Sequence, residues 1–297
     1  MSINKVNTIY LHLGLHKTGT KSIQSGIYPG INHIEYIGRF VDANSYGTDL
    51  YDMITSYCFS QKNSDSKLQK IRETIANILS RKSMLLSEEW FTSNYDPLST
   101  VRLNWQEKLR RLGEVVEGYE IKVLITRREP VDALYSFYCE LLRLGYMRNY
   151  NDFYHFLSED NSAQAYKYTY LEDVIQKHFR TSPAYVEFED LKNGQYVQKL
   201  ENFFSCNINE ISQEKNKKVY TEDGAIVTAI DDSTSIKYKA YAFLRTCWLI
   251  LPYRVRTLMP AASMQKLRNL FFSRFSTNRF VAAPGSRETD YINTNFK

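Results

Sequence analysis

The chain has 297 residues, of which 43% are hydrophobic and 14% aromatic, and its formal net charge is +5. This composition excludes a largely disordered protein and suffices for a sizeable buried core in one domain with an added lobe. The four cysteines, Cys58, Cys139, Cys206 and Cys247, are widely spaced without a C-x-x-C pair, so we expect reduced thiols rather than a disulfide framework or a zinc site.

Neither end of the chain has a pattern typical of membrane insertion. The N-terminus enters an apolar run at once, without the basic region and longer apolar region of a signal peptide. The apolar stretch at 240–251 contains Arg245 and is followed by Pro252, which makes it too short and too charged to span a bilayer. We therefore expect a cytoplasmic protein.

Four apolar runs of strand length recur along the chain, with helical patterns between them. They cover residues 8–13, 83–87, 121–127 and 184–188. Strands that alternate with helices in this way indicate an α/β fold with a central parallel sheet.

The helical patterns follow the strand runs. Residues 21–28 follow the first run, and 100–118 have apolar residues at nearly helical spacing. A third helix is expected from Pro130, a typical first helical residue, to Gly145. Asp190 resembles the N-cap of a helix over 191–204. We interpret 40–65 and 205–235, which are polar and poorly periodic, as loops or insertions.

The segment after the first strand run nearly matches a Walker A loop. Between Gly14 and Ser22 it reads GLHKTGTKS, with Thr20 where the Walker lysine would stand. A loop that leaves a parallel strand and enters a helix directs backbone N–H groups at one spot, which suits phosphate or sulfate. Lys17 and the hydroxyls of Thr18, Thr20 and Ser22 would add charge and donors, while Lys21 with Ser22 leaves open a displaced Walker pair.

The ends of the second and third runs bear on the choice of ligand. A P-loop kinase needs a magnesium ligand, commonly an aspartate at a strand end. Here the second run is followed by Glu88 and Glu89, and the third ends in Arg127 and Arg128. Paired arginines bind an anion rather than a metal, so we expect no metal site.

Two motifs together resemble the 3'-phosphoadenosine 5'-phosphosulfate (PAPS)-dependent sulfotransferases, in the form found in bacterial carbohydrate sulfotransferases. One is the K-[ST]-G-T loop that cradles the 5'-phosphosulfate, and the other is the R-x-P-x-D-x-x-x-S element that binds the 3'-phosphate. A weaker match is 186–194, where Phe188 replaces the tyrosine of the family's Y-E-D-[LM]. The matching residues of the two main motifs are Lys17, Thr18, Gly19 and Thr20, and Arg128, Pro130, Asp132 and Ser136.

The resemblance implies a P-loop-like three-layer sandwich over about residues 8–205 and PAPS as cofactor. It implies that Lys17 and the amides near Gly19 and Thr20 hold the leaving 5'-phosphate, and that Arg128 and Ser136 hold the 3'-phosphate. Lys21 and Ser22 also fall within the implied cofactor loop. The family's C-terminal R-K-G element has only a weak counterpart at 285–287.

A general base is expected at the end of the second strand run. Relatives with the H-x-G-x-H-K-T-G-T loop often have S-x-E here, which points to Glu89, with Glu88 in reserve. Desolvation beside Trp90 would raise the pKa of such a carboxyl group toward neutrality. His16, inside the loop, is the rival base, and the alternative for the glutamates is that they cap the helix that follows.

The C-terminal third is basic. Residues 233–281 contain nine Lys and Arg residues and no Asp or Glu, with Tyr238, Tyr241, Trp248 and Tyr253 among them. A carbohydrate acceptor, a glycolipid or an anionic membrane surface would suit this helical segment, which makes peripheral attachment to the inner membrane a further expectation. A core helix with solvated charges is the alternative.

The sequence thus predicts a sulfotransferase core at 1–210 and a basic helical extension or lid at 211–297, packed on the same domain. The predicted reaction moves a sulfuryl group from PAPS to a carbohydrate hydroxyl. A P-loop kinase or other NTPase and a non-catalytic nucleotide- or polyanion-binding module are the alternatives, and nucleic acid is not the expected partner.

Overall fold

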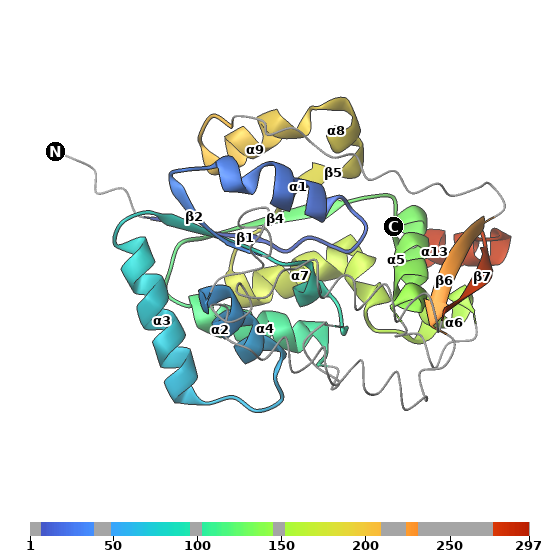
Figure 1. Ribbon diagram of the computed structural model, residues 1–297, viewed down its shortest axis with the longest axis horizontal. Coiled ribbons are helices and arrows are strands. Elements are labelled where there is room, and N and C mark those ends of the chain that lie inside the picture. Colours follow the sequence, from blue (N-terminus) through green and yellow to red (C-terminus); the bar gives the residue numbers. More distant parts are fainter. Residues whose placement is uncertain are drawn as a thin grey trace. The chain divides into compact units, whose positions relative to one another are not determined.

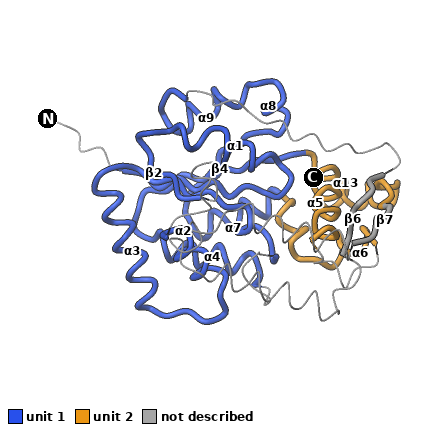
Figure 2. Tube along the Cα trace, in the orientation of Figure 1, with its two compact units in different colours: residues 1–128, 168–215 blue, residues 129–167, 216–297 orange. Residues whose placement is uncertain are grey.

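The computed structural model describes residues 7–38, 49–95, 103–144, 152–208, 224–230 and 276–296. The chain divides into two compact units, coloured separately in Figure 2. Unit 1 contains residues 1–128 and 168–215, and unit 2 contains 129–167 and 216–297. The chain therefore passes from one unit to the other three times. The division into a core at 1–210 and an extension or lid at 211–297 stays a prediction.

Unit 1 is built on a five-stranded parallel sheet with the strand order β2-β3-β1-β4-β5. The four predicted runs form β1 (Ile9–His12), β3 (Ser83–Ser87), β4 (Ile121–Arg127) and β5 (Ala184–Glu187). This confirms the predicted α/β class. The sequence reading missed β2 (Ile34–Gly38), an edge strand that pairs only with β3 and contains the half-exposed Glu35.

Helices cover both faces of this sheet and complete a three-layer arrangement (Figure 1). On one face lie α1 (Thr20–Gly26), α8 (Phe188–Asn193) and α9 (Tyr196–Phe204), whose apolar side chains form a core with Tyr10, Leu85 and Leu124. The opposite face is covered by three helices, which are α2 (Asp49–Phe59), α4 (Trp105–Val116) and α7 (Tyr168–Phe179). The amphipathic helix α3 (Asp65–Leu79) precedes β3 and contacts α2 and α4.

Three local predictions were wrong. Residues 205–235 are not all loop, because Gly224–Ile230 form a strand. Residues 40–65 are not all loop, because α2 buries Leu50, Ile54 and Cys58, which follow one another at helical spacing. Asp190 is not an N-cap, because α8 begins at Phe188 and Asp190 is its third residue. Its carboxylate accepts the backbone N–H of Glu187 at 2.9 Å in a capping box.

Unit 2 contains the other described helices and a two-stranded sheet. The helix predicted from Pro130 is α5 (Pro130–Arg143), followed by α6 (Phe153–Glu159) and a short 3-10 turn, η3 (Ala163–Tyr166). The strands β6 (Gly224–Ile230) and β7 (Ser276–Ala282) pair antiparallel in this sheet. Strand β6 contacts α5, and α13 (Ser286–Asn295) packs on α5 and α6.

Most of the basic segment expected to be helical, including Tyr238, Tyr241, Trp248 and Tyr253, lies outside the described residues. Its described end at 276–281 belongs to strand β7 rather than to a helix. None of the helices in the described ranges is long and apolar enough to cross a bilayer.

Candidate anion-binding and catalytic site

The loop between β1 and α1 has a tightly constrained backbone. Lys17 has a φ angle of 65° and Gly19 one of 92°, both in the left-handed region. A Cβ atom on Gly19 would lie 2.1 Å from Cδ1 of Leu191 in α8, and a Cβ atom on Gly14 would lie 2.1 Å from Oγ1 of Thr20. Both glycines are therefore required by close approach, and Gly19 also by its backbone conformation.

The two threonine hydroxyls of the loop point into the protein. Thr18 Oγ1 donates to the carbonyl of Leu15 at 2.7 Å and lies 2.7 Å from Oγ1 of Thr126 on β4. Thr20 Oγ1 lies 3.2 Å from the same carbonyl and 3.0 Å from Thr126 Oγ1. Both side chains are buried. These hydroxyls tie the loop to β4, so the contribution of Thr18 and Thr20 to an anion site is through their backbone N–H groups.

The two arginines at the end of β4 take different directions, because successive side chains of a strand point to opposite faces. Arg127 Nε bonds Glu187 Oε1 at 2.6 Å, and its guanidinium lies 4.3 Å from the ring centre of Tyr185. Arg128 Nη1 instead reaches the carbonyl of Lys17 at 3.5 Å. Of the two arginines, Arg128 contacts the loop and Arg127 contacts Glu187. The predicted arginine pair therefore places one cation beside the loop.

Two aromatic residues hold Arg128 in place. Its guanidinium lies 4.6 Å from the ring centre of Phe188, the residue that replaces the family's tyrosine. The Tyr168 hydroxyl donates to the Arg128 carbonyl at 2.6 Å and accepts its backbone N–H at 3.1 Å. Sequence reasoning missed Tyr168, because nothing local marks the first residue of α7 as a neighbour of β4.

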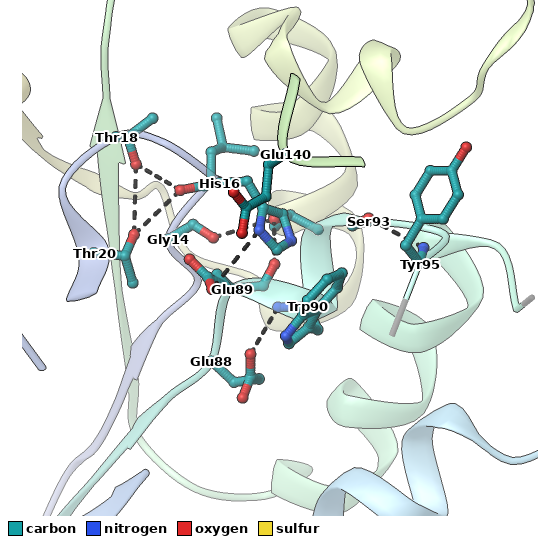
Figure 3. A network of polar contacts seen from close by, with 12 residues as sticks. Gly14, His16, Thr18, Thr20, Glu88, Glu89, Trp90, Ser93, Tyr95 and Glu140 are labelled. Atoms are coloured by element: carbon teal, nitrogen blue, oxygen red, sulfur yellow. Dashed lines mark hydrogen bonds and ion pairs between the residues drawn. The ribbon is translucent and has the colours of Figure 1, made fainter. Parts of the chain in front are cut away.

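Glu88 and Glu89 occupy different environments (Figure 3). Glu88 is fully buried, and its carboxylate caps the 3-10 turn η2 (Glu89–Thr92) by accepting the Trp90 N–H at 2.9 Å and the Tyr51 hydroxyl. This is the capping role that the sequence left open for one of the glutamates. The Glu89 side chain is 20% exposed and faces His16, with 3.7 Å between Glu89 Oε1 and His16 Nδ1.

His16 lies between Glu89 and an indole ring. Its imidazole centre is 4.3 Å from that of Trp90 in an edge-on arrangement, and its side chain is 6% exposed. Two of the three candidate bases proposed from the sequence, Glu89 and His16, are therefore neighbours beside the loop (Figure 3). A carboxylate paired with an imidazole can accept, hold or hand on a proton.

A buried polar cluster lies beneath the loop, at the ends of β1 and β3. His12 Nδ1 is 2.9 Å from Ser87 Oγ, and Gln24 Nε2 from α1 donates to the same oxygen at 3.0 Å. Complete burial lowers the pKa of His12 to about 3 through desolvation of its charged form. His12 is therefore neutral at physiological pH.

The remaining predicted residues lie on α1 and in unit 2. The Lys21 side chain is exposed on α1, and the Ser22 N–H donates to the Gly19 carbonyl at 3.0 Å within the first turn. Ser136 is buried on α5 in unit 2, so its joint action with Arg128 stays a prediction. Arg287, from the weak R-K-G counterpart, lies 3.6 Å from the ring centre of Tyr154 in unit 2.

No protein-family model matches the chain, and no curated protein does. Among solved structures, the chain is similar to a sulfotransferase from Alicyclobacillus acidocaldarius, with 12% sequence identity and a TM-score of 0.43. The alignment covers 86% of this chain and 98% of that one. A similarity this distant does not assign a function, so the function has to be inferred from the residues of this chain.

Proposed function

We propose that this protein is a PAPS-dependent sulfotransferase that transfers a sulfuryl group to a hydroxyl of a carbohydrate or glycolipid. One observation carries the proposal: the loop with Lys17 and Gly19 meets Arg128 where β1 and β4 end, with 3.5 Å between Arg128 Nη1 and the Lys17 carbonyl. Ligands of open α/β sheets bind at this carboxyl edge, and the cations and N–H groups there suit an anionic nucleotide.

The donor set suits PAPS in its chemistry. Lys17 and the loop N–H groups would hold the 5'-phosphate, and Arg128 the 3'-phosphate, with Ser136 as its expected partner. The absence of a side chain at Gly14 and Gly19 lets the loop approach Thr20 and α8 closely, which keeps its N–H groups in one arrangement. PAPS, when bound, supplies the activated sulfuryl group.

The catalytic roles follow from position and charge. Lys17 would neutralise charge that develops on the leaving phosphate, in a manner analogous to phosphoryl transfer. Glu89 would accept the proton of the attacking hydroxyl, and His16 would orient the Glu89 carboxylate from 3.7 Å or take over the proton. Glu88 has a structural role in this scheme, because its carboxylate caps η2.

The acceptor is proposed from the basic segment 233–281. Aromatic rings offer stacking platforms for sugars, and its nine cations would attract sulfated or uronate-rich glycans, or the anionic surface that bears a glycolipid. Peripheral attachment of a cytoplasmic enzyme to the inner membrane is part of this proposal.

The deciding experiment is a thermal-shift measurement with adenosine 3',5'-bisphosphate and with ATP, each with and without magnesium. At about 100 times its dissociation constant, a ligand stabilises the folded state by about 2.7 kcal/mol, which raises Tm by a few degrees. We expect the bisphosphate to stabilise the wild type without metal, and Lys17→Ala and Arg128→Ala to abolish the shift.

Arg127→Ala is the matched control, since Arg127 occupies the same strand end but pairs with Glu187. It should keep the full ligand shift. Stabilisation by magnesium and ATP but not by the bisphosphate would make the chain a nucleotide kinase or NTPase with a displaced Walker loop, and would refute the proposal.

A further inference from the structure

The segment 88–95, which we call the post-β3 segment, contains Glu89 and Trp90 and has a 3-10 turn as its only regular structure. Its first turn, η2, spans only Glu89–Thr92. A short 3-10 turn has little stability of its own, so the position of Glu89 depends on what holds this segment to the rest of unit 1.

Lys108 on α4 is the central anchor of the post-β3 segment. Its ammonium group donates to three backbone carbonyls of that segment: Trp90 at 3.1 Å, Ser93 at 2.7 Å and Tyr95 at 3.1 Å. The Lys108 side chain is completely buried, and its Nζ lies 4.4 Å from the ring centre of Phe59. One ammonium group thus binds carbonyl groups on both sides of a bend in the post-β3 segment.

Two other contacts, made by Thr92 and Asn94, fasten the same segment. Thr92 Oγ1 lies 3.2 Å from the carbonyl of Gly14, which links the segment to the anion-binding loop. Asn94 Oδ1 accepts the N–H of Trp105, the first residue of α4, at 3.0 Å. Helix α4 therefore holds the segment twice, and Lys108 contacts the main chain of Trp90, the residue that follows Glu89.

A buried ammonium is an unusual choice for a purely structural contact. Removing a charge from water is costly, and an apolar core residue would pack at this position without that cost. A neutral side chain, however, cannot donate three hydrogen bonds to converging carbonyls, whereas the ammonium group has three N–H donors. The carbonyls of Trp90, Ser93 and Tyr95 belong to buried residues, so losing the donor would leave them poorly satisfied.

We infer that Lys108 is a positioning residue for the candidate base: it fixes the Trp90 main chain, and through it the side chains of Glu89 and Trp90 against His16. The catalytic part of this inference rests on the proposed sulfuryl transfer. The geometric part does not, because the contact between His16 and Trp90 is measurable without substrate.

The test compares Lys108→Met with the wild type by NMR of the His16 ring protons. These protons are shifted by the ring current of Trp90, and His16→Gln identifies them among the five histidines. We expect Lys108→Met to fold, to lose the wild-type shift of the His16 protons, and to lower kcat by about tenfold to a hundredfold with little change in KM for PAPS.

Two controls separate positioning from stability. Lys82→Met makes the same chemical change at a half-exposed lysine paired with Glu35, and Ile75→Ala destabilises the core through α3. Neither should move the His16 resonance. If Lys108→Met does not fold, Lys108→Gln, which keeps two N–H donors, is used in its place. The expected change in the chemical shift of the His16 protons is then smaller than for Lys108→Met.

An unchanged His16 resonance in a folded Lys108 variant would overturn the inference and leave Lys108 as a structural contact. A wild-type chain that binds no bisphosphate and transfers no sulfuryl group would refute the proposed function instead. In that case the His16 resonance would still decide whether Lys108 positions Trp90.

Discussion

Glu88 and Glu89 are adjacent residues of the same type, but their burial and their hydrogen-bond partners suit them to different roles. Glu88 is sealed in the protein and satisfies a backbone N–H and a tyrosine hydroxyl, whereas Glu89 is partly exposed beside His16. A carboxylate whose oxygens are engaged in capping is poorly suited to accept a substrate proton. The partly exposed carboxylate beside an imidazole is better suited.

Substitution of the two glutamates should therefore separate stability from activity. Glu88→Ala leaves the Trp90 N–H and the Tyr51 hydroxyl without their acceptor, and should lower the free energy of unfolding by about 2–3 kcal/mol in urea denaturation. Glu89→Gln should keep wild-type stability and lower sulfuryl transfer by at least about a hundredfold. Equal loss of transfer in a stable Glu88 variant would reverse the assignment.

The buried imidazole of His12 predicts a pH dependence of stability. Its folded pKa of about 3 lies below its ordinary value of 6.5, so between these values only the unfolded chain binds the proton. The free energy of unfolding should therefore fall as pH drops from 6.5 toward 3, with a slope that approaches about 1.4 kcal/mol per pH unit.

Urea unfolding at pH 7 and pH 5 checks this expectation. His12→Gln removes the titrating ring, so its stability should change less than that of the wild type between the two pH values. The carboxylates are common to both chains and cancel in the difference. Parallel pH profiles for the two chains would show that His12 does not titrate as its burial implies.

At the scale of elements, the site depends on how the loop after β1 is fastened to its neighbours. Thr126 on β4 receives the loop's two threonines, Gly19 packs on α8, and Thr92 links the loop to the post-β3 segment. Each contact joins the loop to a different element of unit 1. The loop is thereby held in shape by the sheet and helices as well as by its own glycines and threonines.

Thr126→Val should loosen that loop with almost no change in volume. The hydroxyls of Thr18 and Thr20 lose a partner at 2.7 and 3.0 Å, which should cost about 1–3 kcal/mol of unfolding free energy. Bisphosphate affinity, measured by calorimetry, should fall by about tenfold, because ordering the loop then opposes binding.

Thr55→Val is the matched control, since Thr55 is equally buried but bonds the carbonyl of Tyr51 within α2. It should retain wild-type affinity. Wild-type affinity in Thr126→Val as well would mean that the threonine contacts do not order the loop for binding.

At the scale of the whole molecule, neither compact unit is continuous in sequence. Helices α5 and α6 lie in the middle of the chain, yet their partners in unit 2 are β6, β7 and α13 near its end. The Tyr135 hydroxyl on α5 donates to the Val281 carbonyl at 2.7 Å, and Ile292 of α13 is fully buried. The C-terminal part thus completes the packing of α5 and α6.

A chain ended at residue 210 tests this dependence. Without β6, β7 and α13, the apolar surfaces of α5 and α6 lose their cover, so we expect binding of a hydrophobic dye, aggregation and a lower Tm. A shortened chain that unfolds cooperatively at the wild-type Tm would instead show that the folding of residues 1–210 does not depend on residues 211–297.

Strong local patterns made part of this structure predictable. Four apolar runs identified four parallel strands, Pro130 marked the start of α5, and two glycines with Lys17 identified the loop. These features are encoded within a few residues, because periodicity, proline geometry and glycine conformation act locally. The edge strand β2 and the helix α2 were missed, since their patterns are short and mixed with polar residues.

By itself, then, the sequence determined the class of fold and the segment around which a site would form. The tertiary structure decided which neighbours act together: Arg128 rather than Arg127 beside the loop, Glu89 rather than Glu88 beside His16, and Lys108 beneath the post-β3 segment. The physical reason is that local conformation depends on adjacent residues, whereas burial and hydrogen-bond partners depend on strands and helices that are distant in sequence and meet only in the folded chain.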